Sequence, residues 1–254
     1  MSLKKRRVRN SLLAIVSALS LSIPKDSFPF EIVNNAHKYI NGVKYPFDVH
    51  AKLDELSTHP LITLSSVRIL LPGQSKDEAE QYKGYLAGGS IDEDIPFGKS
   101  FSHFLDPETK KGIVPLENAL VRARTKFRSA VENYKRGNKE QAYTDLGHVL
   151  HLIQDMHVPE HIFLMQHIAP ESPFERNAVK YYDSRLRNFI NGKDFDTGQL
   201  LMYNSLDEYI LESARFTDGL YKEKFGEAKI QELNEQQVNE LLLDLIPHAI
   251  STSA

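Results

Sequence analysis

The amino-acid sequence predicts an all-α fold, and three observations support this prediction. Apolar residues recur at spacings of three and four along several segments, as on one face of a helix. Capping signals stand at the starts of such segments, and glycines follow some of their ends. No run of four or more residues alternates apolar and polar side chains between turn signals, so no strand is predicted. At 254 residues, the chain can bury a substantial core in a single multi-helix domain.

The N-terminal segment is first basic and then apolar. The string KKRRVR precedes an apolar run from Leu12 to Ile23, an order typical of a secretory signal peptide. The run is short for a membrane span, and an amphipathic first helix explains it equally well. We therefore expect residues 1–27 to be a signal peptide or an N-terminal helical extension, and residues 28–254 to form the all-α domain. A cleaved signal would make the protein secreted or periplasmic, and without one we expect it to be cytoplasmic.

Local signals predict the helices in order. The capping box Ser75–Glu78 predicts a helix that begins there and ends at the glycines of positions 88 and 89. Apolar residues from Ala119 to Tyr134 predict the next helix, which Gly137 ends, and Asn138 is placed to cap the helix after it. Further helix starts are predicted at SLDE (Ser205–Glu208) and NEQQ (Asn234–Gln237).

Composition excludes several classes of site. The chain has no cysteine, which excludes thiolate zinc fingers, iron–sulfur clusters and disulfides. A bound metal must therefore be held by histidine, carboxylate, backbone or water, a ligand set that suits zinc and similar divalent ions. Removing the five positive charges of KKRRVR from the net charge of −3 leaves −8. This mildly acidic remainder gives no basic surface for duplex nucleic acid.

The strongest functional signal is the histidine-rich motif LGHVLHLIQDMHVPEH, residues 146–161. A helix advances about 100° per residue, so His148, His151 and Asp155 share one narrow stripe of its surface. His151 and Asp155 are an i,i+4 pair, close enough to bind one metal ion or two adjacent ions. A proline then ends the helix, so His161 points elsewhere and could serve another ion. The motif therefore predicts a metal site.

The segment SHFLDP to VPEH, residues 102–161, resembles the central region of the zinc-dependent phospholipases C, which are distantly related to the zinc-dependent single-strand nucleases. It contains a His-Phe-x-Asp-Pro element, a long helix, and a Leu-Gly-x3-His-x3-Asp-x3-Pro-x-His element. The similarity is clear over residues 85–190 and weaker over 55–85. It implies an all-α domain of the zinc-dependent phospholipase C and single-strand nuclease type with a cluster of roughly two or three Zn²⁺ ions.

The resemblance implies a role for each matching residue. His103 and His151 would bind a first ion, and Asp155 would bridge it to a second. Asp94 follows a glycine-containing loop and would also bind the first ion; because the loop length differs from that of the family, Asp92 is the alternative. His59, at the mouth of a helix, matches an early metal-binding histidine of the family.

The resemblance is weaker at the third ion. His161 and Glu175 match family ligands, but Glu171 stands where the family has histidine, and His167 could supply the missing imidazole. Glu175 has a second interpretation as the last residue of a capping box that starts at Ser172. Some family members also use the amino group of an N-terminal tryptophan, whereas this chain has no tryptophan.

The other histidines have no such support. His148 has no family counterpart, and we expect it to contact ligands rather than the metal. We expect His157 to be exposed. His37, His50 and His248 are predicted to be structural.

The resemblance implies hydrolysis of a phosphodiester, in which a metal-bound hydroxide attacks phosphorus and Asp94 orients or deprotonates the water. Paired ions suit this reaction because they hold phosphoryl oxygens and lower the pKa of bound water towards ~7. A phospholipid substrate, with peripheral contact to the membrane, is favoured. Two alternatives remain open: a single-strand nuclease with the same cluster, and a non-catalytic binding protein with an incomplete cluster. Nothing in the sequence indicates an oligomeric state.

Overall fold

The computed structural model describes residues 56, 58–94, 101–113, 117–165, 173–196 and 199–254. Within these ranges the chain is helical and contains no strand, which confirms the all-α prediction. No helix among them is long and apolar enough to cross a membrane. Residues 1–27 lie outside these ranges, so the signal peptide and the domain boundaries stay predictions. The α-helices are α4 (Thr58–Ile69), α5 (Gln74–Asp92), α6 (Ala119–Lys135), α7 (Lys139–Asp155), α8 (Pro159–Ile162), α9 (Pro173–Tyr181), α10 (Asp183–Ile190), α11 (Leu206–Phe225) and α12 (Glu235–Ser253).

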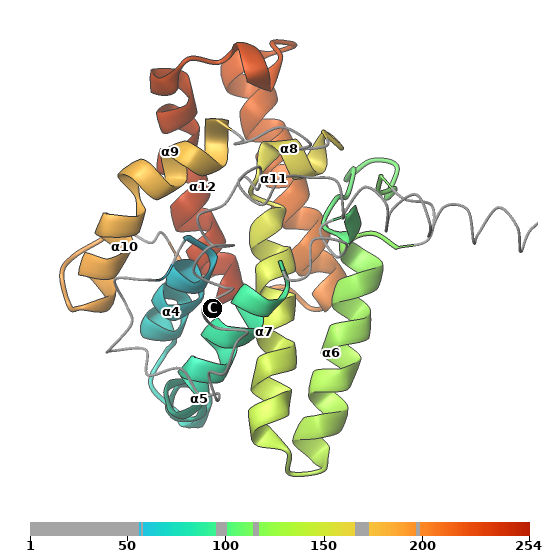
Figure 1. The fold of residues 1–254 in the computed structure, drawn as a ribbon, viewed down its shortest axis with the longest axis vertical. Coiled ribbons are helices and arrows are strands. Elements are labelled where there is room, and N and C mark those ends of the chain that lie inside the picture. Colours follow the sequence, from blue (N-terminus) through green and yellow to red (C-terminus); the bar gives the residue numbers. More distant parts are fainter. Residues whose placement is uncertain (1–55, 57, 95–100, 114–116, 166–172, 197–198) are drawn as a thin grey trace, which may run out of the picture.

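Helix α7, which carries most of the histidine-rich motif, occupies the centre of the fold. It lies between α5 and α6 and also packs against α4, α11 and α12 (Figure 1). Its apolar face is buried against α6 and α11, with Leu152 and Met156 fully buried. The opposite stripe of α7 therefore faces α4 and α5. A second part of the core joins α4 and α12 to α9 and α10.

Helices α5 and α7 approach each other through two glycines. A Cβ atom added to Gly89 would clash with the backbone of Thr144, and one added to Gly147 would clash with the backbone of Leu86. The prediction that α5 stops at the glycines was wrong, because Gly89 serves this close packing and the helix continues to Asp92. The predicted start at Ser75 was also wrong. Helix α5 begins at Gln74, after Gly73, and has no side-chain cap.

The other predicted helix starts depend on local hydrogen bonds. The side chain of Asn234 accepts a hydrogen bond from the backbone N–H of Gln237 and forms the predicted capping box. Ser205 accepts one from the N–H of Glu208, although Glu208 itself reaches back to Asn204. Helix α7 does begin after Asn138, but that side chain makes no capping hydrogen bond.

Candidate metal centre

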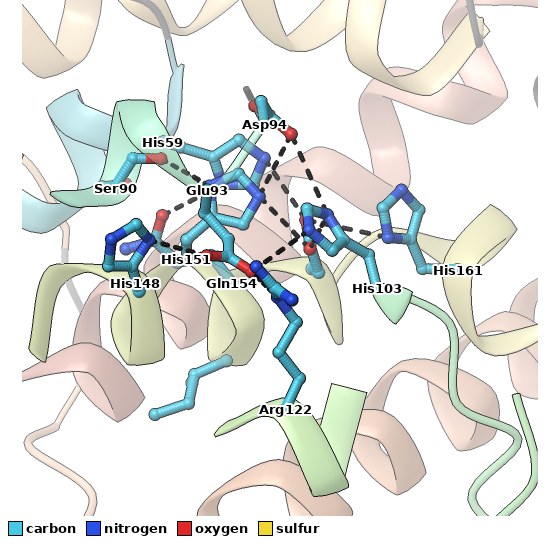
Figure 2. A network of polar contacts seen from close by, with 12 residues as sticks. His59, Ser90, Glu93, Asp94, His103, Arg122, His148, His151, Gln154 and His161 are labelled. Carbon is cyan, nitrogen blue, oxygen red and sulfur yellow. Dashed lines mark hydrogen bonds and ion pairs between the residues drawn. The ribbon is translucent and has the colours of Figure 1, made fainter. Parts of the chain in front are cut away.

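Six of the predicted ligands converge on one place from five separate segments of the described chain, and Figure 2 labels them except for Asp155. The first turn of α4, the two residues that follow α5, and the loop before α6 each supply one ligand. Helix α7 supplies two ligands, and α8 supplies one. All are buried except for one aspartate side chain, Asp94, which is 22% exposed. In this order the residues are His59, Asp94, His103, His151, Asp155 and His161.

Four of these side chains form what we call the central group: Asp94, His103, His151 and Asp155. Asp155 Oδ2 lies 3.0 Å from His103 Nδ1 and 3.3 Å from His151 Nε2. Asp94 Oδ1 lies 3.4 Å from His151 Nε2 and 3.9 Å from His103 Nδ1. With metal–ligand bonds of about 2.0–2.2 Å, ligand atoms around a tetrahedral zinc ion lie about 3.3–3.6 Å apart. The spacing in the central group fits one such ion.

The second oxygen of Asp155 faces two other histidines. Asp155 Oδ1 lies 3.5 Å from His59 Nε2 and 3.7 Å from His161 Nδ1. His59, His151 and Asp155 also offer ligand atoms that lie within 4.8 Å of one another. Asp155 thus presents one oxygen to each of two groups of imidazoles, the arrangement that a bridging carboxylate requires.

The predicted third site is only partly described. The other ring nitrogen of His161, Nε2, lies 3.8 Å from Oε1 of Glu175, a buried carboxylate in the first turn of α9. Glu171 and His167 lie outside the described residues, so their roles stay predictions. Asp92 does not join the central group; it lines a polar depression of the surface beside Lys126 and His148.

Hydrogen bonds on the outer side of the rings fix which nitrogen faces Asp155. The carbonyl oxygen of Ser90 can only accept, so it takes the proton of His151 Nδ1 at 2.8 Å. Gln154 donates through Nε2 to Thr63, so its Oε1 accepts from His59 Nδ1 at 3.0 Å. A neutral imidazole carries one proton, and therefore the inward Nε2 atoms carry lone pairs, as metal ligands must.

The inward-facing polar atoms lack other partners. Among the described residues, both Asp155 oxygens and His151 Nε2 are buried without a hydrogen bond of good geometry. Buried polar atoms in folded proteins rarely lack a hydrogen-bond partner, and a bound ion is one explanation where they do. The chemistry and the spacing of this donor set fit zinc.

The carboxylates make this site attractive to cations. Burial disfavours a charged imidazole, but the carboxylates of Asp155 and Asp94 outweigh it and raise the pKa of His151 well above 6.5. Burial also disfavours the charged form of His161, but Asp155 and Glu175 outweigh burial and raise the pKa of His161 to about 9. The pKa of Asp155 is held well below its usual value, despite burial, by His151, His161 and His103. His59 differs, since burial and the nearby His151 lower its pKa to about 4.

Sequence reasoning missed Glu93, which is fully buried beside the central group. Its carboxylate contacts His103, the guanidinium of Arg122, and Nδ1 of His148 at 2.6 Å. His148 was expected to contact ligands; the contact seen here is with Glu93, a neighbour of the predicted ligand His103. Glu93 stands directly before Asp94 in the sequence, but nothing in its local pattern indicates partners on α6 and α7.

The prediction that His157 is exposed was wrong. The turn after α7 directs the ring inward, where Nδ1 donates to the carbonyl oxygen of Ile153 and Nε2 lies 2.8 Å from His248 Nδ1. The His248 ring stacks on Phe216, with 3.6 Å between centroids. His248 is therefore structural, as predicted, and His157 is its partner. His37 and His50 lie outside the described residues.

Comparison with known proteins decides the family. Residues 58–241 match the family described as zinc dependent phospholipase C. The chain belongs to this family. Its name specifies zinc and a class of phosphodiester-hydrolysing enzyme, which confirms the resemblance seen in the sequence. No curated protein matches the chain.

Solved structures confirm the fold. The alpha toxin of Clostridium absonum is 19% identical, with a TM-score of 0.57, and the alignment covers 80% of this chain. The Clostridium perfringens alpha-toxin from an avian strain is 18% identical, with a TM-score of 0.59 over the same share. This chain spans 62% of the length of each toxin chain.

Proposed function

We propose that the protein is a zinc-dependent phosphoric diester hydrolase of the phospholipase C type. The observation that carries this proposal is the position of Asp155, whose two buried oxygens face two sets of imidazole nitrogens. Asp94, His103, His151 and Asp155 would hold one ion, and His59, Asp155 and His161 a second. Glu175, with Glu171 or His167, would complete a third site.

Bound zinc supplies positive charge that stabilises phosphoryl oxygens and acidifies a water molecule. Within the chain, Asp94 is the residue suited to handle that water, because its side chain is the most exposed of the central group. Although burial raises it, the pKa of Asp94 is lowered overall by His151 and His103. Asp94 is therefore ionised at neutral pH and can accept a hydrogen bond that orients the water for attack.

A phospholipid is the favoured substrate, and single-stranded nucleic acid is the alternative. Nucleases of single strands stack bases on accessible aromatic rings. The Phe104 ring stacks on His161 with a centroid separation of 4.8 Å, but Phe104 is buried and cannot receive a base. This favours a phospholipid as the substrate. Peripheral contact with a membrane belongs to the same proposal.

Elemental analysis of the purified protein tests the proposal, with His151→Ala as the variant and His248→Gln as the control histidine. We expect about two or three zinc ions per chain in the wild type, in line with a cluster that clamps both sides of a phosphoryl group. The His151→Ala variant should lose most of this zinc and all measurable hydrolysis of phosphatidylcholine, whereas His248→Gln should keep both.

Two outcomes would change the assignment. Cleavage of single-stranded DNA but not of phosphatidylcholine by the zinc-loaded protein would make it a nuclease. Absence of zinc above background, even after incubation with zinc at neutral pH, would favour a non-catalytic protein.

A further inference from the structure

Glu93 is a buried acidic residue that lies beside the proposed metal ligands without being one of them. It directly follows α5, and its side chain is 0% exposed. It accepts a hydrogen bond from Arg122 of α6, and its Oε2 lies 2.6 Å from Nδ1 of His148 on α7 (Figure 2). Its Oε1 lies 3.5 Å from Nε2 of His103. Burying a carboxylate costs free energy unless several partners compensate it, so this position calls for a specific role.

The three histidines nearest to Asp155 differ in which group lies behind their outer nitrogen. Behind His59 lies the amide oxygen of Gln154, and behind His151 the carbonyl of Ser90. Behind His103 lies the carboxylate of Glu93, at an ion-pair distance of 3.5 Å rather than in a hydrogen bond of good geometry. An ionised carboxylate is the strongest acceptor of the three. Carboxylate–histidine contacts of this kind orient metal-binding rings and increase their basicity.

Glu93 is placed to accept the His103 proton when an ion is bound. A metal-binding Nδ1 must carry a lone pair, so the single proton of the neutral ring would then lie on Nε2, towards the Glu93 carboxylate, which can only accept. The lone pair then lies on Nδ1, the atom that is 3.0 Å from Asp155 Oδ2. Arg122 and His148 approach Glu93 from other helices and limit its movement.

We propose that Glu93 is a positioning residue that orients His103 for metal binding and that Arg122 and His148 hold Glu93 in place. This inference rests on the proposed function, because it requires the central group to bind an ion. It assigns Glu93 no direct contact with that ion. The competing explanation is purely structural: the Arg122–Glu93 pair would only tie the end of α5 to α6.

Asp145 provides a matched control for the structural explanation. It is also a buried carboxylate at a helix interface, where it accepts hydrogen bonds from Ser129 and Asn133 of α6 and from Gln141 of its own helix. None of these partners is a proposed ligand. Replacing Asp145 therefore removes a buried acidic link between helices without changing the support of His103.

The test compares Glu93→Gln with Asp145→Asn in the full chain. Three quantities are measured: zinc affinity by competition with a chromophoric chelator, the visible spectrum of the cobalt-substituted protein, and urea unfolding of the zinc-free protein. We expect Glu93→Gln to weaken the tightest zinc by about 10- to 100-fold, the usual effect of removing such an outer partner. Its cobalt bands should shift in position or intensity, whereas Asp145→Asn should change only the unfolding midpoint.

A wild-type zinc affinity and cobalt spectrum in Glu93→Gln would overturn the inference and leave the proposed function intact. An equal loss of zinc affinity in Glu93→Gln and Asp145→Asn would also overturn it, since the effect would then be one of stability. A wild-type protein that binds no zinc would overturn both the inference and the proposed function.

If Glu93→Gln does not fold, His148→Gln gives an independent test. It removes one support of Glu93 and leaves Glu93 beside His103, so we expect a smaller loss of zinc affinity, about 3- to 10-fold, below the range for the direct partner. Unchanged affinity and cobalt spectrum in His148→Gln would contradict the proposed support of Glu93.

Discussion

Two groups of histidines in this chain differ in what surrounds them. The rings of His103, His151 and His161 face carboxylates, above all that of Asp155. His157 and His248 face each other, a backbone carbonyl and the ring of Phe216. In the first group the pKa values are raised, whereas burial lowers the pKa of His157 to about 3 and that of His248 to about 4.

The difference shows that histidine content alone does not identify a metal site. Burial by itself favours the neutral ring and disfavours its charged form. Buried carboxylates reverse this preference and create a place for a cation, either a proton or a metal ion. His151 and His157 come from one short motif, and only the carboxylate neighbours separate their roles.

The variant Asp155→Asn is the most direct test of the difference between the two groups of histidines. It removes the charge that both sets of imidazoles share, so we expect zinc affinity to fall by more than the roughly 100-fold upper limit for an outer partner. Phosphodiester hydrolysis should be lost with it. Zinc content after dialysis measures the effect, with Asp145→Asn on the same helix as control. Full zinc content in Asp155→Asn would contradict the bridging role.

A second variant, Gly147→Ala, should disturb the group of histidines that face carboxylates through the packing of α7 on α5. The new methyl group would push α7 away from α5, and such overpacking usually costs about 1–3 kcal/mol of unfolding free energy. Because Asp94 follows α5 and His151 lies on α7, zinc affinity should fall as well. Gly219→Ala is the control: nothing lies near its added Cβ, so a gain of about 0.4–1 kcal/mol is expected. Urea unfolding that shows no difference between the variants would contradict the close packing.

The His157–His248 pair should make the zinc-free protein sensitive to mild acid. Both pKa values lie below the unfolded value of 6.5, so the unfolded chain takes up protons first as the pH falls. The stability is therefore complete above pH 6.5 and declines towards pH 4 to 3. His157→Gln should flatten this decline, as measured by urea unfolding across the pH range. An unchanged slope in the variant would mean that other groups cause the acid sensitivity.

His161 should change the pH dependence of stability in the opposite direction. The effect should be smaller, because one group titrates instead of two. Its pKa in the folded, zinc-free protein is raised from 6.5 to about 9. The stability from its attraction to Asp155 and Glu175 is thus complete below pH 6.5 and is lost as the pH rises through about 9. In His161→Gln this alkaline decline should be reduced, which chemical denaturation at pH 6 to 10 can detect. The same decline in wild type and variant would contradict the raised pKa.

The sequence predicted features that depend on neighbours along the chain. The caps at Ser205 and Asn234 act within one helical turn, and the i,i+4 spacing of His151 and Asp155 follows from helix geometry alone. The end of α5 was misplaced because the role of Gly89 depends on contact with α7. Likewise, His157 is buried by packing with α12, which its own segment does not reveal.

The candidate site shows the same limit. Glu93 was missed because its partners Arg122 and His148 come from two other helices, α6 and α7. The sequence favoured Asp94 but left Asp92 open as the alternative, because the choice depends on how the chain turns after α5. The structure brings Asp94 to His151 and leaves Asp92 at the surface. Glu171 and His167 fall in a range that the structure does not describe.

Because the ligands come from five segments, bound ions would also affect the stability of the folded protein. The chain contains no cysteine, so no disulfide can join segments that lie far apart in sequence. Ions shared by α4, α5, α7, α8 and the loop before α6 would act as cross-links in their place. Ligand binding to the native state alone adds to the free energy of unfolding in proportion to the logarithm of ligand concentration. The heat resistance of this protein would then follow the free zinc concentration of its surroundings.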